Sequence, residues 1–270
     1  MTSLLKRLIS LTLVATMVAA CSTTPTGRAQ LTMKSDAALA QEASRQLAII
    51  RANAPLVQDR ATIDYVSCVA NAIVGVLEGD DAALYWEMAI VNQPEVNAFV
   101  MPGGKMVVKS GILSVAENQH QLAAVIGHEV AHVTAHHANE RMSRAELTSY
   151  GVDVVALILG GGYRNQTAGA YGAADTLSTL GVMNPFTRMQ ESEADVIGLK
   201  YMAMAGFDPR ESVKLWQNMN SSEKTAKVPE FLSTHPSGDT RIELMVENLP
   251  EMLALYNEAQ AQGRYPDCQR

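Results

Sequence analysis

The most informative stretch of the sequence is Gln121–Asn139, QLAAVIGHEVAHVTAHHAN, where His128, Glu129 and His132 form an HExxH pattern inside an apolar helical repeat. Residues four apart lie on the same face of a helix, so the two imidazoles can reach one tetrahedral ion. Glu129 follows one step around the helix, where its carboxylate can take a proton from the attacking water as a general base. A buried helix does not carry such side chains without a partner. We therefore predict a site for one Zn²⁺ ion per chain.

The residues after HExxH exclude one class of zinc peptidase. A metzincin requires HExxHxxGxxH, but Ala138 stands six residues after His132 and no glycine lies between positions 133 and 139. We interpret His136 and His137 as exposed residues at the end of the helix, where the negative end of the dipole favours histidine. A third protein ligand must therefore come from elsewhere in the chain.

Glu191 and Asp195 lie four residues apart at the start of a later helical pattern, and so share one face. Glu191 can bind the metal, while Asp195 can accept a hydrogen bond from a ligand histidine and fix its tautomer. Glu193 is expected to point elsewhere, into solvent. The alternative is a charged first helical turn favoured by the macrodipole, and spacing alone does not decide between the two.

The rest of the chain predicts an α+β fold that is mostly helical. Apolar residues recur at helical spacing over 31–79, and three β-rich segments follow at 84–92, 95–101 and 105–109. These segments, broken by turn residues, indicate a small antiparallel sheet. The segment 150–181, rich in glycine and alanine, predicts two helices around a hinge, either a lid or a packed hairpin.

Composition excludes several classes of protein. The chain has 270 residues, of which 47% are hydrophobic and 18% charged, which is inconsistent with a disordered tail or a protein with many membrane spans. The formal net charge of −7 and the lack of basic runs argue against nucleic acid as a partner.

The first residues have the pattern of a secretion signal, with Lys6 and Arg7 before an uncharged apolar stretch that ends at Ala20. Residues 18–21, Val-Ala-Ala-Cys, resemble a bacterial lipobox, which implies cleavage and a lipid on Cys21. An ordinary signal peptide or an uncleaved anchor is the alternative. We expect a signal peptide at 1–20, a lipidated flexible tether at 21–30 and a single domain at 31–270. Cys68 and Cys268 then remain as a possible disulfide pair, or as two free thiols.

The motifs together resemble the HtpX and CAAX-protease type zinc metallopeptidases, peptidase family M48, and within them the periplasmic BepA/LoiP-like lipoprotein branch. The resemblance extends from about residue 31 to 249. It is carried by HExxH and ExxxD together with Asn97-Ala98-Phe99, Pro102-Gly103-Gly104, Ser233-Thr234-His235-Pro236 and Arg241. It implies a zincin-like (gluzincin) metallopeptidase domain with an active-site HExxH helix.

The resemblance also implies roles for individual residues. His128 and His132 match the zinc histidines, Glu129 matches the catalytic base, Glu191 the third ligand and Asp195 the carboxylate that supports a ligand histidine. By the same resemblance, His235 is a histidine over the zinc that can take the fourth position. Arg241 matches an arginine suited to stabilising an oxyanion.

These roles predict a zinc metalloendopeptidase that degrades misfolded or stalled envelope and outer-membrane proteins. Its expected location is the periplasmic side of the bacterial outer membrane, held by the lipid anchor. Expected partners are unfolded or misassembled substrate proteins and the outer-membrane protein assembly machinery. One alternative is a chaperone or assembly factor in which proteolysis is secondary. A weaker alternative is an aminopeptidase or other zinc hydrolase.

Overall fold

The computed structural model describes residues 21–149, 186–223, 230–235 and 239–270. Along the chain the elements are β1 (Cys21–Thr23), β2 (Ala29–Leu31), α2 (Asp36–Asn53), α3 (Arg60–Val74), α4 (Gly79–Ala82), β3 (Glu87–Val91), β4 (Ala98–Met101), β5 (Lys105–Lys109), η1 (Ser110–Ser114), α5 (Gln119–Thr134), α6 (His137–Ser149), α9 (Arg188–Met204), α10 (Arg210–Glu223), α11 (Glu230–Thr234) and α12 (Asp239–Ala261). This confirms a mostly helical chain with small sheets. The predicted leader at 1–20 and the hinge segment at 150–181 lie outside the described residues.

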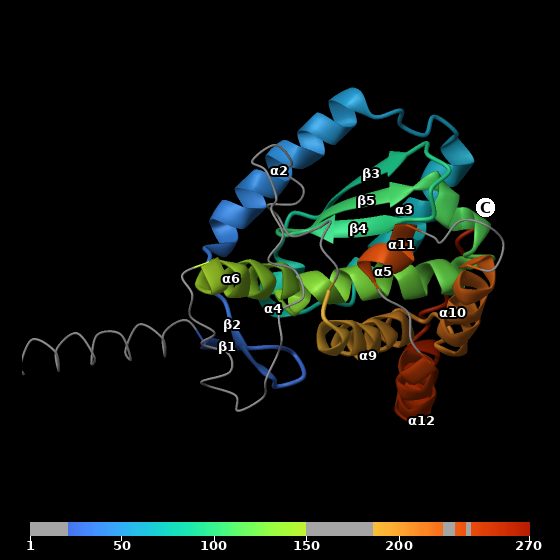
Figure 1. Ribbon diagram of the computed structural model, residues 1–270. Coiled ribbons are helices and arrows are strands. Elements are labelled where there is room, and N and C mark those ends of the chain that lie inside the picture. Colours follow the sequence, from blue (N-terminus) through green and yellow to red (C-terminus); the bar gives the residue numbers. More distant parts are fainter. Residues whose placement is uncertain (1–20, 150–185, 224–229, 236–238) are drawn as a thin grey trace, which may run out of the picture.

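The larger sheet has the strand order β3-β5-β4 (Figure 1). Strands β4 and β5 are antiparallel, with Phe99 opposite Val107, and are joined by a turn at 102–104 in which Gly103 and Gly104 both have positive φ. Strands β3 and β5 are parallel, with Ala89 opposite Val107. The predicted antiparallel pairing therefore holds for β4 with β5 but not for β3 with β5. Because β5 inserts between the other two strands, the chain must skip one strand position between β3 and β4.

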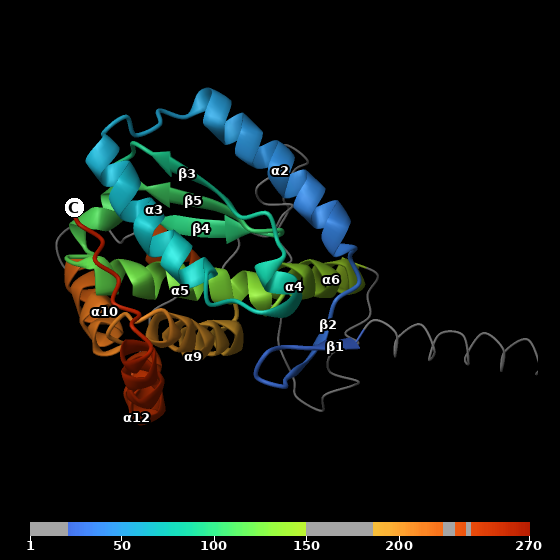
Figure 2. The same cartoon turned by 180° about the vertical axis from the view of Figure 1, so that it is seen from behind.

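The sheet separates two hydrophobic layers, because successive side chains of a strand point to opposite faces. Val107 packs with Ala43 and Leu47 of α2 on one face. Met106 and Val108 belong to the main core on the other face, together with residues of α3 and α5. Figures 1 and 2 show α2 crossing one side of the sheet, with α3 and α5 on the opposite side. Strand β4 is the edge strand that lies next to α5.

Helix α5 is the central helix of the molecule and is buried along almost its whole length. Its start is capped by Asn118, whose side-chain oxygen accepts hydrogen bonds from the backbone of His120 and Gln121, both at 3.0 Å. On the side away from the sheet it packs against α9. Two glycines allow this close approach: a Cβ on Gly198 would lie 2.7 Å from the backbone nitrogen of His128, and one on Gly127 would lie 2.9 Å from the carbonyl oxygen of Gly198.

The N-terminal residues form a hairpin and not the flexible tether that the sequence suggested for 21–30. Strands β1 and β2 are antiparallel, with Ser22 opposite Gln30. Thr24 and Gln30 are buried, and β2 contacts α6. The polar composition of this segment suggested that its side chains are exposed to solvent. Several of them instead form hydrogen bonds with buried residues of α6 and α9. Lipidation of Cys21 stays a prediction.

The C-terminal tail is fastened to the other end of α5. Cys68 of α3 and Cys268, the pair considered from the sequence, form a disulfide with Cα atoms 5.7 Å apart. The backbone nitrogen of Cys268 donates to the side-chain oxygen of Gln119, the first residue of α5, at 2.9 Å. Among the described residues, no helix combines the length and the apolar character needed to cross a membrane.

Candidate metal centre

Helix α5 presents both histidines of HExxH on one face. The Nε2 atoms of His128 and His132 lie 3.1 Å apart, and both side chains are buried. Helix α9 brings Glu191 against them, with one carboxylate oxygen 3.4 Å from His128 Nε2 and the other 3.6 Å from His132 Nε2. Thr187 begins α9 with a capping box, which fixes the first turn on which Glu191 stands.

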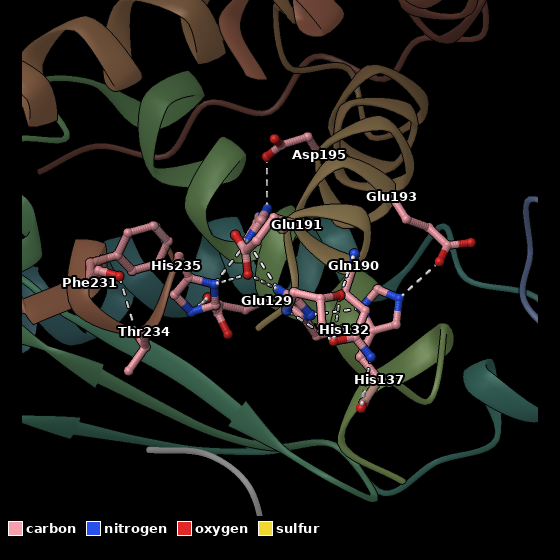
Figure 3. Close-up of polar contacts among 12 residues, drawn as sticks. Glu129, His132, His137, Gln190, Glu191, Glu193, Asp195, Phe231, Thr234 and His235 are labelled. Carbon is pink, nitrogen blue, oxygen red and sulfur yellow. Dashed lines mark hydrogen bonds and ion pairs between the residues drawn. The ribbon is translucent and has the colours of Figure 1, made fainter. Parts of the chain in front are cut away.

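His235 completes the group from the residue after α11. Its Nδ1 lies 3.2 Å from Nε2 of His128 and 3.0 Å from a carboxylate oxygen of Glu191 (Figure 3). The backbone nitrogen of His235 donates to the carbonyl of Phe231 at 2.8 Å, which holds the residue at the end of that short helix. The sequence residues expected to bind zinc are thus brought together from three separate elements.

The four side chains fit a zinc ion. One donor atom from each of His128, His132, Glu191 and His235 lies within 4.8 Å of the other three, and all four residues are buried. Tetrahedral zinc with bonds of about 2.0–2.1 Å separates its ligand atoms by roughly 3.3 Å, close to the distances given above. Three imidazole nitrogens and one carboxylate oxygen are also a donor set that zinc prefers.

Asp195 and Arg241 contact the donor residues His128 and Glu191 and hold them in place. Oδ1 of Asp195 lies 3.0 Å from Nδ1 of His128, so that Nε2 of the same ring faces the other donors. The guanidinium of Arg241 donates to both oxygens of Asp195 at 2.7 Å and lies 2.8 Å from Glu191. It also stacks on Trp216, 3.9 Å from the ring centre. These contacts make Arg241 a positioning residue for the two carboxylates of α9.

Glu129 lies beside the four donor residues and is not one of them. One oxygen accepts a hydrogen bond from the backbone nitrogen of Val100 in β4 at 3.3 Å, and the other lies 3.2 Å from Nε2 of His235. Among the described residues, β4 pairs with a strand only on the side of β5, and Val100 directs its N–H from the other edge toward the site.

The pKa values of the two buried glutamates are shifted in opposite directions. Burial raises the pKa of the Glu129 carboxyl above its ordinary value, against the charges of His235 and His128. Burial also acts to raise the pKa of Glu191, but the charge of His235 and hydrogen bonds from His128 and His235 outweigh it and hold that pKa well below the usual range. Glu191 is thus suited to stay ionised as a ligand, and Glu129 to exchange a proton.

Sequence reasoning missed two residues, His137, which contacts the donor residue His132, and Glu193, which contacts His137. His137, expected at an exposed helix end, is fully buried, and its Nδ1 lies 2.8 Å from Nδ1 of His132. Glu193, expected in solvent, is also buried and lies 3.1 Å from Nε2 of His137. His137 is buried because the left-handed backbone of His136, with φ of 52°, follows the end of α5 and turns the next residue inward. Glu193 is buried because Thr24, Thr26 and Arg28 of the hairpin cover it. The adjacent histidines after HExxH were the only sequence signal for this contact.

A cavity of about 600 Å³ borders the metal centre. It reaches His132 at the end of α5 and the turn at Pro102 and Gly103 between β4 and β5. The start of α2 and the region of α4 form its other walls, through Asp36, Asp80 and Asp81. The cavity therefore connects the turn that follows β4 with one of the donor residues, His132.

Comparison with known proteins agrees with the family that the sequence motifs resemble. Residues 63–248, well over half of the chain, match the sequence profile of Peptidase family M48. The chain is 36% identical over 231 residues to the mitochondrial metalloendopeptidase OMA1 of Schizosaccharomyces pombe, covering 85% of this chain and 64% of that protein. It is 38% identical over 181 residues to the protein of the same name from Saccharomyces cerevisiae, covering 64% and 50%. It is 32% identical to the beta-barrel assembly-enhancing protease of Yersinia pestis, covering 72% and 40%.

Two consequences follow from these relatives. The chain spans less than two thirds of the length of each, so it is similar to a part of them. Several relatives are named as mitochondrial proteins, which contradicts the predicted location on the periplasmic side of a bacterial outer membrane. That prediction was wrong because it relied on a short leader pattern, and such a pattern does not by itself specify a compartment.

Proposed function

The chain belongs to peptidase family M48, and from this membership we propose that it cleaves unfolded or misassembled proteins as a zinc-dependent endopeptidase. The observation that carries the proposal is the convergence of four buried donor residues beside a separate buried glutamate, Glu129. Support for misfolded or stalled envelope proteins as substrates comes from the name of the Yersinia pestis relative, a protease that enhances β-barrel assembly.

His128, His132, Glu191 and His235 would hold the zinc ion. Bound zinc supplies Lewis acidity that polarises the scissile carbonyl and activates water. Glu129 takes the proton of the attacking water and later gives it to the leaving amine, a role that its raised pKa favours. Asp195 keeps the His128 ring in the orientation that directs Nε2 inward.

An extended substrate is expected to pair with the free edge of β4. The edge offers backbone groups to a peptide strand, as in other cases of β-strand addition, and the N–H of Val100 already faces Glu129 at 3.3 Å. Main-chain pairing depends weakly on the substrate's side chains. We therefore expect cleavage of unfolded chains with little sequence preference.

The roles of His235 and Arg241 are further proposals on the same geometry. His235 would cap the metal at rest, because its Nδ1 already lies among the donor atoms. If so, the enzyme is latent until this residue moves, and His235→Ala raises basal cleavage. Arg241 would act on the oxyanion only indirectly, since its guanidinium is engaged by Asp195 and Glu191.

The test is digestion of unfolded casein by the zinc-loaded protein, with and without a chelator. We expect chelation to abolish cleavage, and Glu129→Gln to lower its rate by about 100- to 10,000-fold, the usual contribution of a general base. Glu117→Gln, an exposed residue just before the same helix, is the matched control and should leave the rate unchanged. Chelator-resistant cleavage would contradict the proposal.

Two further readouts separate the alternatives. Peptides with blocked N-termini should be cut as fast as free ones, since an aminopeptidase requires a free amine. If Glu129→Gln restores every phenotype of a deletion strain, the main role is that of a chaperone or assembly factor, and proteolysis is secondary.

A further inference from the structure

Arg28, in the loop between β1 and β2, reaches two buried carboxylates on different helices. Its Nε lies 2.7 Å from Glu193 of α9, and its two terminal nitrogens donate to both oxygens of Glu140 of α6 at 2.8 and 2.9 Å. Glu140 is fully buried and Glu193 nearly so. A buried carboxylate requires a cationic or hydrogen-bonding partner, so the hairpin supplies a charge that these helices need.

Glu193 is surrounded by donors. Its oxygens accept hydrogen bonds from the hydroxyls of Thr24 and Thr26 and from Arg28, all three in the N-terminal hairpin. The fourth partner is Nε2 of His137 at 3.1 Å (Figure 3). An ionised carboxylate can only accept hydrogen bonds, so the hydrogen of this contact belongs to His137 Nε2.

This assignment determines the next contact in the chain of hydrogen bonds. A neutral imidazole with its hydrogen on Nε2 is an acceptor at Nδ1. Because Nδ1 of His137 lies 2.8 Å from Nδ1 of His132, the His132 nitrogen must be the donor. The other nitrogen of His132, Nε2, is then left with a free lone pair, and this is the atom that lies 3.1 Å from Nε2 of His128. The reverse direction would set the lone pair of His137 Nε2 against the carboxylate of Glu193.

We propose that Arg28 is a positioning residue for the zinc ligand His132, acting through Glu193 and His137. Thr24, Thr26 and Arg28 hold the carboxylate of Glu193, Glu193 sets the hydrogen on His137, and His137 fixes the tautomer and orientation of the ligand ring. The three hairpin residues lie outside the segment 63–248 that matches the family profile. The N-terminal hairpin therefore supports the metal site through Glu193 and His137, without a recorded contact to a donor residue.

The first experiment measures zinc affinity by competition with a chromophoric chelator. Arg28→Met, which keeps the length and removes the charge, should weaken zinc binding by about 10-fold, the lower end of the loss seen when a direct partner of a ligand histidine is removed, because Arg28 acts through two intermediate residues. Arg28→Lys should restore part of the affinity, since it keeps the charge but loses the planar fork. Arg45→Met is the control, because Arg45 pairs with Glu42 on the exposed side of α2.

Thermal unfolding of the metal-free proteins separates positioning from a general loss of stability. We expect Arg28→Lys to unfold near the wild-type temperature while still binding zinc more weakly. Equal zinc affinity of Arg28→Met and wild type would overturn the proposal.

The second experiment needs no variant and so does not depend on whether Arg28→Met folds. Nitrogen-15 NMR of the zinc-loaded protein with labelled histidines reports which ring nitrogen of each residue carries hydrogen. The expected signature is hydrogen on Nε2 of His137 and on Nδ1 of His132. Hydrogen on Nδ1 of His137 would mean that the hydrogen bonds run in the opposite direction, from His137 to His132, and would overturn the proposal.

Discussion

Three acidic residues on the first turns of α9 have three different roles, although they lie within five positions. Glu191 faces the histidines of HExxH, Asp195 lies one turn further on the same face and contacts His128, and Glu193 faces the N-terminal hairpin. Helical spacing separates the first two from the third. Each carboxylate is buried and matched by at least one cationic or hydrogen-bonding partner, which is the condition under which a buried charge is stable.

His136 provides a pH-dependent contact next to the site without contacting any ligand. Its Nδ1 lies 3.6 Å from Asp36 at the start of α2. The contact with His136 lowers the pKa of Asp36, and the contact with Asp36 raises the pKa of His136. The histidine's share of this stabilisation is complete below its unfolded pKa of about 6.5 and is lost as pH rises through its raised folded pKa.

We therefore predict that His136→Asn costs more stability at about pH 5.5 than at about pH 8.5. Asparagine is chosen because it tolerates the left-handed backbone at this position, so the variant removes the charge without adding strain. The Asp36 side chain is exposed and that of His136 half-buried, so solvent screens the pair and the difference should stay below about 1 kcal/mol. Chemical unfolding of the two proteins at both pH values measures it. An equal cost at the two pH values would show that the pair contributes nothing.

At the scale of elements, the metal centre depends on how closely α5 and α9 approach. Three of the four donor residues, His128, His132 and Glu191, come from two helices whose backbones approach closely at Gly127 and Gly198. Any side chain at Gly198 would meet the backbone of His128, which is itself a donor residue. Packing and metal binding are therefore coupled at this crossing.

We predict that Gly198→Ala separates the two helices, lowers stability by about 1–3 kcal/mol, and weakens zinc binding in the same variant. The added Cβ would lie 2.7 Å from the nitrogen of His128, a contact that only a shift of backbone can relieve. Lys200→Ala, on an exposed position of α9, is the control for a change to alanine in this helix. Denaturant unfolding and chelator competition give the two readouts. Normal zinc affinity in Gly198→Ala would mean that the ligands tolerate a wider helix spacing.

The elements that the sequence predicted are those determined by local spacing. Helical periodicity alone grouped His128, Glu129 and His132 of HExxH. It also placed Glu191 and Asp195 on one helix face, but their assignment to the metal site required the family resemblance. His235 and Arg241 required a family resemblance, because nothing local relates them to α5. The parallel pairing of β3 with β5 and the burial of His137 depend on contacts between distant segments and on one left-handed residue. Periodicity contains no information on either.

At the scale of the whole molecule, the two ends of the described chain are fastened to opposite ends of the central helix. The N-terminal hairpin contacts α6 and α9 near the end of α5 that carries His132. The C-terminal tail contacts the start of α5 through Gln119 and is covalently joined to α3. Arg270 also donates to the carbonyl of Leu113 at 2.9 Å. We expect the first attachment to affect metal binding and the second to affect stability.

Removing the disulfide tests whether the C-terminal attachment affects stability and not metal binding. Cys68 and Cys268 are 200 residues apart in sequence, and closing a loop of that length stabilises a protein by up to about 5 kcal/mol in the chain-entropy account. We predict that the double variant Cys68→Ser and Cys268→Ser loses about 2–5 kcal/mol in free energy of unfolding. Its zinc affinity should remain close to that of the wild type, because the tail contacts α5 more than two turns before His128. Denaturant unfolding and chelator competition on the same samples measure both quantities. A large loss of zinc affinity in the double variant would mean that the attachment of the tail also positions the ligands on α5. A free energy of unfolding equal to that of the wild type would mean that the disulfide adds no stability beyond the packing of the tail.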